Sequence, residues 1–449
     1  MAPQKTDPMR QQKTGTPGTP GTPGTPGTRG TPGLWPARAA RTLTTTALAA
    51  SVLATPTALT LLPAAPAARA ADSGQCTFPS KNYEGRPWAL QRVNLDEMWA
   101  QSKGKGVQVA VIDTGVDAKH PQLTDAVEAS KGKNYLPAKN DKGEKIERGN
   151  AHGTTDTVGH GTRVAGIIAA RPAQGTGFVG LAPEATIIPI KQNDAEGNGT
   201  ADTLASSIRH AVDAGADVIN ISQDTANAVK PDATLKSAVD YALNKQVVVV
   251  ASAGNDGLGG KDKTTYPASY AGVLAVASSD RNNERASFSQ AGEFVGVAAP
   301  GVDMISTVPG GGHCSDNGTS FSAPYVAAVA ALLKSAYPKW TAAQIVAQIE
   351  QTAERSIPGH DRLVGWGVID PVKALTDVDP ANPVESPAAE QSDAHAKAPD
   401  VAPLHLGETP EQRNTRLGTY AAVGALVLAT ALAGTAVAVR DARRRGSHR

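Results

Sequence analysis

Apolar, β-branched runs recur along the middle of the chain, and segments with helical spacing separate several of them. The runs cover residues 107–112, 186–190, 217–221, 247–251 and 273–277, and the helical patterns cover residues 163–170, 201–214 and 232–245. Strands that are apolar throughout and alternate with helices are typical of a parallel sheet covered on both faces. The pattern therefore predicts an α/β, doubly wound domain over residues 83–376. In such domains the functional groups collect at the carboxyl ends of the strands.

A longer hydrophobic segment, without any amphipathic period, lies near the C-terminus. Residues 417–439 are 23 consecutive positions without a charge. As a helix they would extend about 34 Å, enough for a hydrocarbon core of ~30 Å. Arg416 precedes the segment, and five arginines follow it in residues 440–449. This charge bias predicts a transmembrane helix with a cytoplasmic tail and an extracytoplasmic body, and a long buried core helix is the alternative.

The N-terminal 70 residues differ from the rest of the chain. A Gly-Thr-Pro repeat indicates a low-complexity tail, and a basic, then apolar, then Ala-Arg-Ala sequence follows it. That order is typical of a secretory signal peptide cleaved after Ala70. We expect a short extension over residues 71–82, a polar, exposed insert at residues 131–149, and a disordered Pro/Ala-rich linker over residues 377–416.

The overall charge and the cysteine count bear on the partners of the chain and on the state of its thiols. A net charge of +1 gives no electrostatic reason to expect a nucleic-acid partner. Cys76 and Cys314 are the two cysteines, and outside the cytoplasm two cysteines allow one disulfide. Two buried free thiols are the alternative, but an exported domain favours the bridge.

The first chemical motif is Ile-Asp-Thr-Gly, which contains Asp113 and follows the strand predicted over residues 107–112. A carboxylate at a strand end is held by rigid backbone, which suits the orientation of an imidazole. An aspartic protease is excluded because it needs two such carboxylates, and the chain has no second Asp-Thr-Gly.

The second motif is Gly-His-Gly-Thr, which contains His160 and leads into the helical pattern of residues 163–170. A competing His-Gly-Thr contains His152, eight residues earlier. The small-residue helix after His160 can pack against the sheet and fix the ring, whereas no element follows His152. We therefore predict that His160 is the catalytic base and that His152 is an exposed loop residue.

The third motif, Gly-Thr-Ser-Phe-Ser-Ala-Pro, places Ser320 at the start of an Ala-rich helical pattern. A helix N-terminus offers positive potential where an oxyanion develops. A plain N-cap is the commoner role for such a serine, and Ser322 is the neighbouring candidate. The Gly-Thr sequence before Ser320 favours Ser320 as the nucleophile. Asn255 follows the strand of residues 247–251, where it is either part of a turn or an oxyanion donor.

Asp113, His160, Asn255 and Ser320 stand in this chain order, each at the end of a predicted element. The order Asp, His, Ser is that of subtilisin, and the motifs resemble the subtilisin-like (subtilase) family across residues 83–376. The resemblance implies a serine endopeptidase with an Asp113–His160–Ser320 triad, with Asn255 at the oxyanion and with no organic cofactor or metal. No loop has the closely spaced oxygen ligands of a calcium site. Residues 221–224 depart from the family, because many subtilases have Ser-x-Gly-Gly there, on the strand that pairs with substrate.

Within this family, the architecture resembles the mycosins, which are membrane-anchored subtilases associated with type VII secretion systems. A cysteine-bearing stretch ahead of the domain, a Pro-rich spacer and one C-terminal helix carry this resemblance. It implies an enzyme at the cell membrane that cleaves exported proteins, with type VII membrane components as partners. It also implies that residues 71–82 wrap the domain without blocking it. A general cell-surface protease and a mainly structural stabiliser of a secretion complex are the alternative functions.

Overall fold

A parallel sheet forms the centre of the part of the chain that the computed structural model describes, which is residues 76–139, 142–195, 199–222, 232–258, 264–389 and 408–446. Within those residues the strand order is β2-β3-β1-β4-β5-β6-β7, and β8 and β9 form a separate antiparallel hairpin. The strands are β1 (Gln108–Asp113), β2 (Lys133–Asn134), β3 (Thr186–Lys191), β4 (Val218–Ile221), β5 (Val248–Ser252), β6 (Leu274–Ser279), β7 (Val295–Pro300), β8 (Met304–Thr307) and β9 (His313–Asp316). The predicted signal peptide, residues 1–70, and positions 390–407 of the predicted linker lie outside the described residues.

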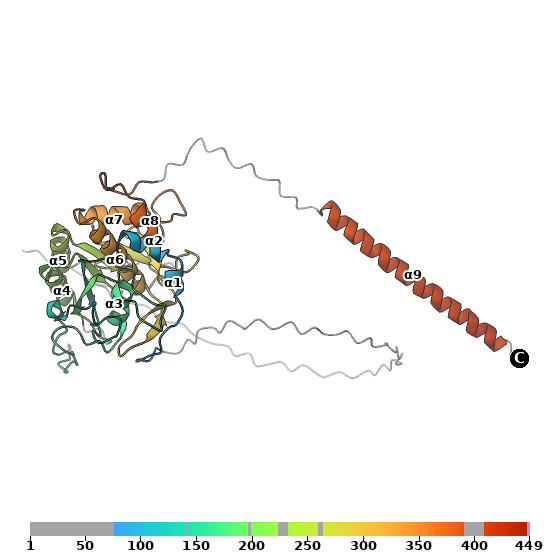
Figure 1. Cartoon of the computed structure of the whole chain (residues 1–449), viewed down its shortest axis with the longest axis horizontal. Coiled ribbons are helices and arrows are strands. Elements are labelled where there is room, and N and C mark those ends of the chain that lie inside the picture. The colour runs from blue at the N-terminus through green and yellow to red at the C-terminus, as the bar shows by residue number, and fades with distance from the viewer. Residues whose placement is uncertain are drawn as a thin grey trace, which may run out of the picture. The chain divides into compact units, whose positions relative to one another are not determined.

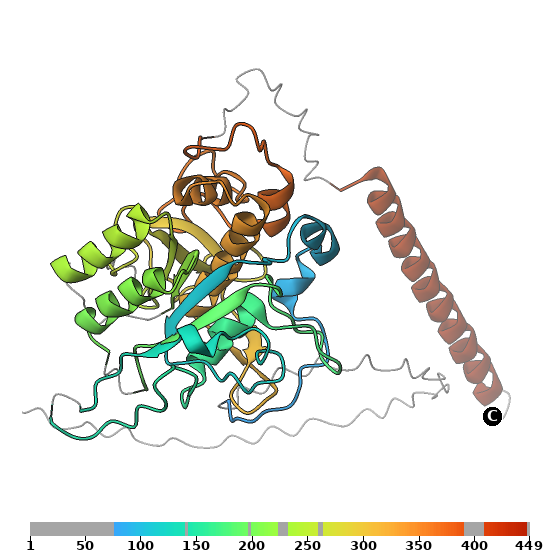
Figure 2. The ribbon, with the colours of Figure 1, turned by 60° about the vertical axis from the view of Figure 1, so that its left-hand side comes forward.

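Helices cover both faces of the sheet. The helices of the described residues are α1 (Trp88–Gln91), α2 (Leu95–Gln101), α3 (His160–Ala169), α4 (Ala201–Asp213), α5 (Ala233–Asn244), α6 (Thr319–Ala336), α7 (Ala342–Gln351), α8 (Pro371–Thr376) and the exposed α9 (Pro410–Gly446), with a 3₁₀ turn η1 at Ala129–Lys131. Figures 1 and 2 show α4 and α5 side by side along one face. α3 and α6 pack together on the other face.

Successive side chains of β1 enter two different hydrophobic cores. Val109 and Val111 belong to the core that contains α3 and α6, whereas Ala110 and Ile112 belong to the core that contains α4 and α5. Because side chains alternate along a strand, a sheet covered on both faces needs apolar residues at every position. This two-sided burial confirms the predicted α/β fold and explains why the strands appear as continuous apolar runs.

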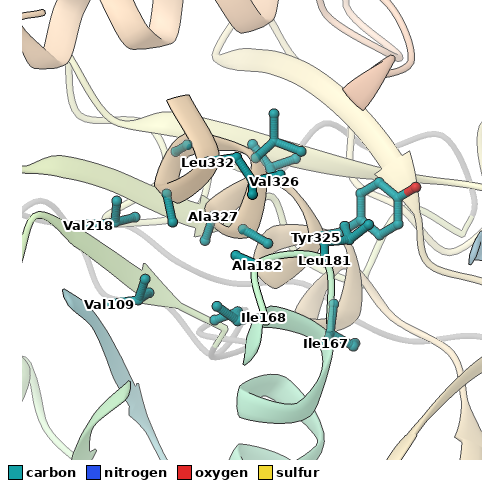
Figure 3. Packing of buried hydrophobic residues seen from close by; sticks show 14 of the residues in the cluster. Val109, Ile167, Ile168, Leu181, Ala182, Val218, Tyr325, Val326, Ala327 and Leu332 are labelled. Carbon is teal, nitrogen blue, oxygen red and sulfur yellow. The ribbon is translucent and has the colours of Figure 1, made fainter. Parts of the chain in front are cut away.

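Helix α6 lies at the centre of the first core. Its residues from Thr319 to Leu333 are all buried. Figure 3 shows Val326 and Ala327 of α6, Ile168 of α3 and the strand residue Val109 in one cluster of buried side chains. A helix that is apolar on every side requires such an enclosed position. The buried helix therefore gives Ser320, in its first turn, a rigid support.

Helix α3 begins three residues earlier than its apolar spacing predicts. α3 starts at His160 itself, after Gly159, whose φ of +80° is a conformation that glycine adopts readily. At Gly161, a Cβ atom would lie 2.1 Å from the backbone oxygen of Gly115. The absence of a side chain at Gly161 therefore lets the first turn of α3 touch the end of β1.

The prediction of a polar, exposed insert at residues 131–149 is wrong in part. Part of it, Lys133–Asn134, forms the edge strand β2 and pairs with β3, and Leu136 is fully buried. The expectation of an exposed segment was wrong for this part, because pairing with β3 and packing of one leucine depend on tertiary contacts. Elsewhere in the insert Lys142 and Glu144 are exposed, as expected.

The C-terminal helix α9 spans Pro410–Gly446 and contains the predicted segment 417–439. Within the described residues it is the one helix that is long and apolar enough to cross a membrane.

Candidate active site

The carboxyl end of β1 brings Asp113 to the first turn of α3. Asp113 is 1% exposed, and its Oδ1 accepts a 2.7 Å hydrogen bond from Nδ1 of His160. The same oxygen accepts a 2.7 Å hydrogen bond from the backbone N–H of Thr114. Because the carboxylate accepts from Nδ1, the neutral imidazole carries its proton there, and Nε2 is the basic nitrogen.

Opposing effects act on the imidazole of His160. Burial of the ring lowers the pKa of His160, but the charge of Asp113 and its hydrogen bond outweigh burial and raise this pKa above its ordinary value. Arg163 acts in the lowering direction, and Asp156 acts in the raising direction. The site thus stabilises the imidazolium that forms when this ring accepts a proton.

A second buried carboxylate, Asp156, holds the backbone around His160. Its Oδ1 accepts hydrogen bonds from the N–H groups of Val158 (3.1 Å) and Gly159 (2.8 Å) and from the Thr114 hydroxyl (2.9 Å). Its Oδ2 accepts from the N–H and the hydroxyl of Thr162, at 2.9 and 2.7 Å. Burial raises the pKa of Asp156 despite these donors. Asp156 therefore links the end of β1 to the first turn of α3.

Ser320 completes a cavity that the other predicted residues also line. It is the second residue of α6 and is 5% exposed. The cavity has a volume of about 340 Å³, and Asp113, His160, Asn255 and Ser320 are all among its lining residues. Within the described residues no hydrogen bond joins Ser320 to His160, and such bonds are often long before a substrate binds. The fold thus brings the four predicted residues, from β1, α3, α6 and the loop after β5, to one cavity.

Asn255 is bound to the start of α6. Its Oδ1 accepts hydrogen bonds from the backbone N–H of Thr319 (2.9 Å) and from the Thr319 hydroxyl (3.0 Å). Because the oxygen is engaged there, the orientation of the amide is set, and Nδ2 is the end that can donate to a ligand. The contact also ties the loop after β5 to the turn that carries Ser320.

Three residues that the motifs did not single out form a series of contacts that begins at the His160 ring. The Phe321 ring lies 5.3 Å from the His160 ring, and the Arg163 guanidinium lies 5.5 Å from the Phe321 ring. Arg163 also forms an ion pair with Asp316 of β9. Phe321 and Asp316 line the cavity, so this group forms one of its walls. Nothing local in the sequence indicates the group, because Arg163 and Asp316 are 153 residues apart.

The two competing residues lie apart from the cavity lining. His152 is exposed on a loop, where its backbone N–H donates to Asn150 Oδ1. Ser322 is fully buried and shares a 3.0 Å hydrogen bond with the hydroxyl of Ser278. The exposed loop position of His152 is as the sequence predicted, and Ser322 lies outside the cavity lining.

The N-terminal extension lies against the β8–β9 hairpin. Cys76 and Cys314 form a disulfide, with their Cα atoms 5.9 Å apart. Backbone hydrogen bonds join Ser80 to Gly311 and His313 to Lys81 in the same region. The Phe78 ring lies so close to Gly159 that a Cβ there would be 3.1 Å from it. The extension therefore lies beside the turn that precedes His160.

A metal site has no candidate in the part of the chain that the structure describes. No group of three or more His, Cys, Asp or Glu side chains there is arranged to hold an ion. The cavity itself offers a carboxylate bound to an imidazole, a buried hydroxyl at a helix N-terminus, and an amide.

Comparison with known proteins agrees with this arrangement. The family model described as the subtilase family matches residues 104–367. The chain belongs to the subtilase family. Its subtilase domain includes the whole sheet from β1 to β7. The thermophilic serine proteinase of Bacillus sp. (strain AK1) is 40% identical over 296 residues, which cover 66% of this chain and 68% of that protein. Thermitase of Thermoactinomyces vulgaris is 37% identical over 293 residues, which cover 65% of this chain and 97% of thermitase.

Among solved structures, this subtilase is similar to mycosins. MycP1 with its N-terminal propeptide removed has a TM-score of 0.58 and 35% identity, covering 67% of this chain and 99% of that one. The MycP3 protease from the type VII (ESX-3) secretion system has a TM-score of 0.57 and 34% identity, covering 66% and 90%. The chain is thus a subtilisin-like serine protease with mycosins as structural neighbours.

Proposed function

We propose that this chain is a membrane-anchored, extracytoplasmic serine endopeptidase that cleaves exported proteins, with Ser320 as nucleophile. The observation that carries the proposal is the Asp113–His160 hydrogen bond at a cavity that Ser320 also lines. A nucleophile, a base and a group that orients the base are the parts that acyl transfer requires.

In the first half of the reaction, Nε2 of His160 takes the proton from the Ser320 hydroxyl as Oγ attacks the peptide carbonyl carbon. Asp113 stabilises the resulting imidazolium. The oxyanion accepts hydrogen bonds from Asn255 Nδ2 and from the backbone N–H of Ser320. The peptide C–N bond then breaks, and His160 passes its proton to the leaving amine.

In the second half, a water molecule attacks the acyl-enzyme at the same carbonyl carbon. His160 accepts the proton of that water, and the oxyanion again lies at the donors of Asn255 and Ser320. When the ester bond breaks, the proton returns to Ser320 Oγ, and the carboxyl product leaves. Every proton in the cycle moves through His160, so no other acid or base is needed.

The C-terminal helix and the structural neighbours support the proposed cellular setting. Residues 417–439 of α9 carry no charge, and Arg440, Arg443, Arg444 and Arg445 follow them. By the positive-inside bias the tail lies in the cytoplasm and the protease domain outside it. Two of the similar structures are proteases of type VII secretion systems. We therefore expect exported proteins as substrates and membrane components of such a system as partners.

A fluorophosphonate probe tests the catalytic part of this proposal. It should label the wild-type chain covalently and leave Ser320→Ala unlabelled, because only an activated serine reacts. Ser322→Ala is the matched control, since it removes a neighbouring hydroxyl and should still be labelled. Labelling of Ser320→Ala equal to that of the wild type would contradict the assignment.

Protease added to intact cells tests the topology. It should release a soluble body by cutting within residues 379–416 and leave the basic tail protected. Digestion of the tail in sealed cells would overturn the orientation. Comparison of the exported proteins of wild-type and Ser320→Ala cells tests the substrates: unchanged sizes of all of them would favour a structural role.

A further inference from the structure

A second cavity lies at the edge of the sheet opposite to Ser320. It has a volume of about 290 Å³ and is framed by α7, by the turn between α5 and β5, and by residues 385–387. Val248, the first residue of β5, lines this cavity, whereas Asn255 follows the carboxyl end of the same strand. The two cavities therefore lie at opposite ends of β5, and the second has no part in the proposed reaction.

Glu350 brings a carboxyl group to the lining of this cavity. The residue is partly buried, and within the described residues its side chain makes no hydrogen bond or ion pair. The nearby guanidinium of Arg355 donates to the backbone oxygens of Glu350 (3.3 Å) and Gln351 (3.2 Å). On its inner side, Glu350 Oε1 would lie 3.0 Å from a Cβ atom at Gly296, so β7 closes that side.

Two features make this position costly for an acidic residue. Burial raises the pKa of Glu350 to about 7, and burial is the only cause of this shift. Glu350 also lies in the last turn of α7, where the negative end of the helix dipole disfavours a carboxylate. A bound cation would remove both penalties, because it would supply the charge partner that the fold does not.

The rest of the lining specifies the shape of that cation. Leu243, Val248 and Val346 present apolar walls, and Glu385 at the cavity is bound to Gln344 by a 2.7 Å hydrogen bond. Glu385 and Glu350 are the charged residues of the lining, so its charge is negative. A volume near 300 Å³ is at the lower limit for ligand sites and suits one long side chain. An aliphatic stem against the walls with a cationic end at Glu350 fits this lining.

We propose that this cavity binds an arginine side chain of a partner protein, with Glu350 as the anchoring carboxylate. Arginine is favoured over lysine because its planar guanidinium can donate two parallel hydrogen bonds to one carboxylate. The site is independent of the proposed catalytic residues. Since residues 385–387 frame it, the partner would be held where the chain leaves the protease domain towards the linker.

The test uses N-acetyl-arginine amide as the probe and N-acetyl-citrulline amide as its neutral match of nearly equal shape. The protein is the full chain in detergent micelles with Ser320→Ala, and binding is read by saturation-transfer NMR and titration at pH 8. We expect the arginine probe to bind at least fivefold more tightly than the citrulline probe. Glu350→Gln should remove that difference, whereas Glu385→Gln, the matched control, should retain more than half of the signal.

The pH dependence provides a second measurement. With a pKa of about 7, the ionised fraction of Glu350 falls about tenfold between pH 8 and pH 6, so the Kd of the arginine probe should rise about tenfold. Equal binding of the two probes, a Kd that is the same at both pH values, or full binding by Glu350→Gln would each overturn the proposal. Fluorophosphonate labelling of Glu350→Gln with Ser320 intact shows that this variant is folded.

Discussion

Replacement of Asp156 by asparagine isolates the contribution of the second buried carboxylate. The amide keeps the size of the side chain, and its oxygen can still accept from Val158, Gly159 and Thr114. The amide nitrogen, however, would face the N–H of Thr162, which donates to Oδ2 in the wild type. Two donors then meet, and the N–H in the first turn of α3 loses its acceptor.

The expected size of the effect follows from these contacts. A buried donor left without its acceptor costs about 1–3 kcal/mol. Loss of the negative charge acts in the opposite direction, because burial already raises the pKa of Asp156 and so destabilises its ionised form. We therefore expect a net loss of less than about 3 kcal/mol in the free energy of unfolding, with Tm falling by roughly 2–4 °C for each kcal/mol lost.

Activity should change more than stability. Without the two hydrogen bonds that Thr162 donates to Oδ2 of Asp156, the turn that carries His160 is held less firmly, and a displacement of about 1 Å can lower kcat ~10²-fold. Burial and Asp113 dominate the pKa of His160, and Asp156 adds a smaller raising effect. Its removal should therefore move the acid limb of the kcat/KM profile to lower pH.

The assay is cleavage of a chromogenic peptide anilide between pH 5 and 9, together with thermal unfolding. Asp202→Asn, which neutralises an exposed carboxylate in the first turn of α4, is the control: it should leave kcat and the pH profile unchanged and lower the free energy of unfolding by no more than about 1 kcal/mol. An unchanged kcat and pH profile in Asp156→Asn, combined with lower stability, would show that Asp156 supports only the fold. A higher Tm would show that the cost of burying its charge exceeds the value of its hydrogen bonds.

Three further predictions concern other parts of the molecule. His160→Ala should lower kcat by ~10⁶, while His152→Ala stays within twofold of the wild type in the same peptide assay; the reverse result would exchange their roles. Cys76→Ser removes a disulfide between residues 238 apart. Calorimetry should show a loss in the free energy of unfolding that is below the chain-entropy limit of about 5.5 kcal/mol, because backbone hydrogen bonds still hold the extension. An unchanged Tm would contradict this prediction. Burial, with a smaller effect of His120, lowers the pKa of His313 from 6.5 to about 4. The unfolded chain therefore binds this proton first, and stability should fall as the pH drops from 6.5 to 4; a slope that His313→Gln does not reduce would exclude this cause.

The sequence alone determined the fold class and the candidate residues of the site. The apolar runs that became β1, β3, β4, β5 and β6 are continuous because both faces of those strands are buried, and this property is visible in a local window. The motifs of Asp113, His160, Asn255 and Ser320 were also recognisable, because each combines a reactive side chain with the end of an element. Their meeting at one cavity follows from the parallel sheet, although their catalytic roles stay predictions.

The tertiary structure decided what depends on contacts between distant residues. β7 consists largely of small residues and is recognised as a strand by its pairing with β6. Arg163 and Asp316 are 153 positions apart, and Tyr83 donates to His313 across 230 positions. The cost of an acidic group at Glu350 likewise arises from packing between α7 and β7. Periodicity and short motifs indicate which side chains of a segment are buried and which are exposed to water. The position of one charge beside another depends on how the whole chain packs.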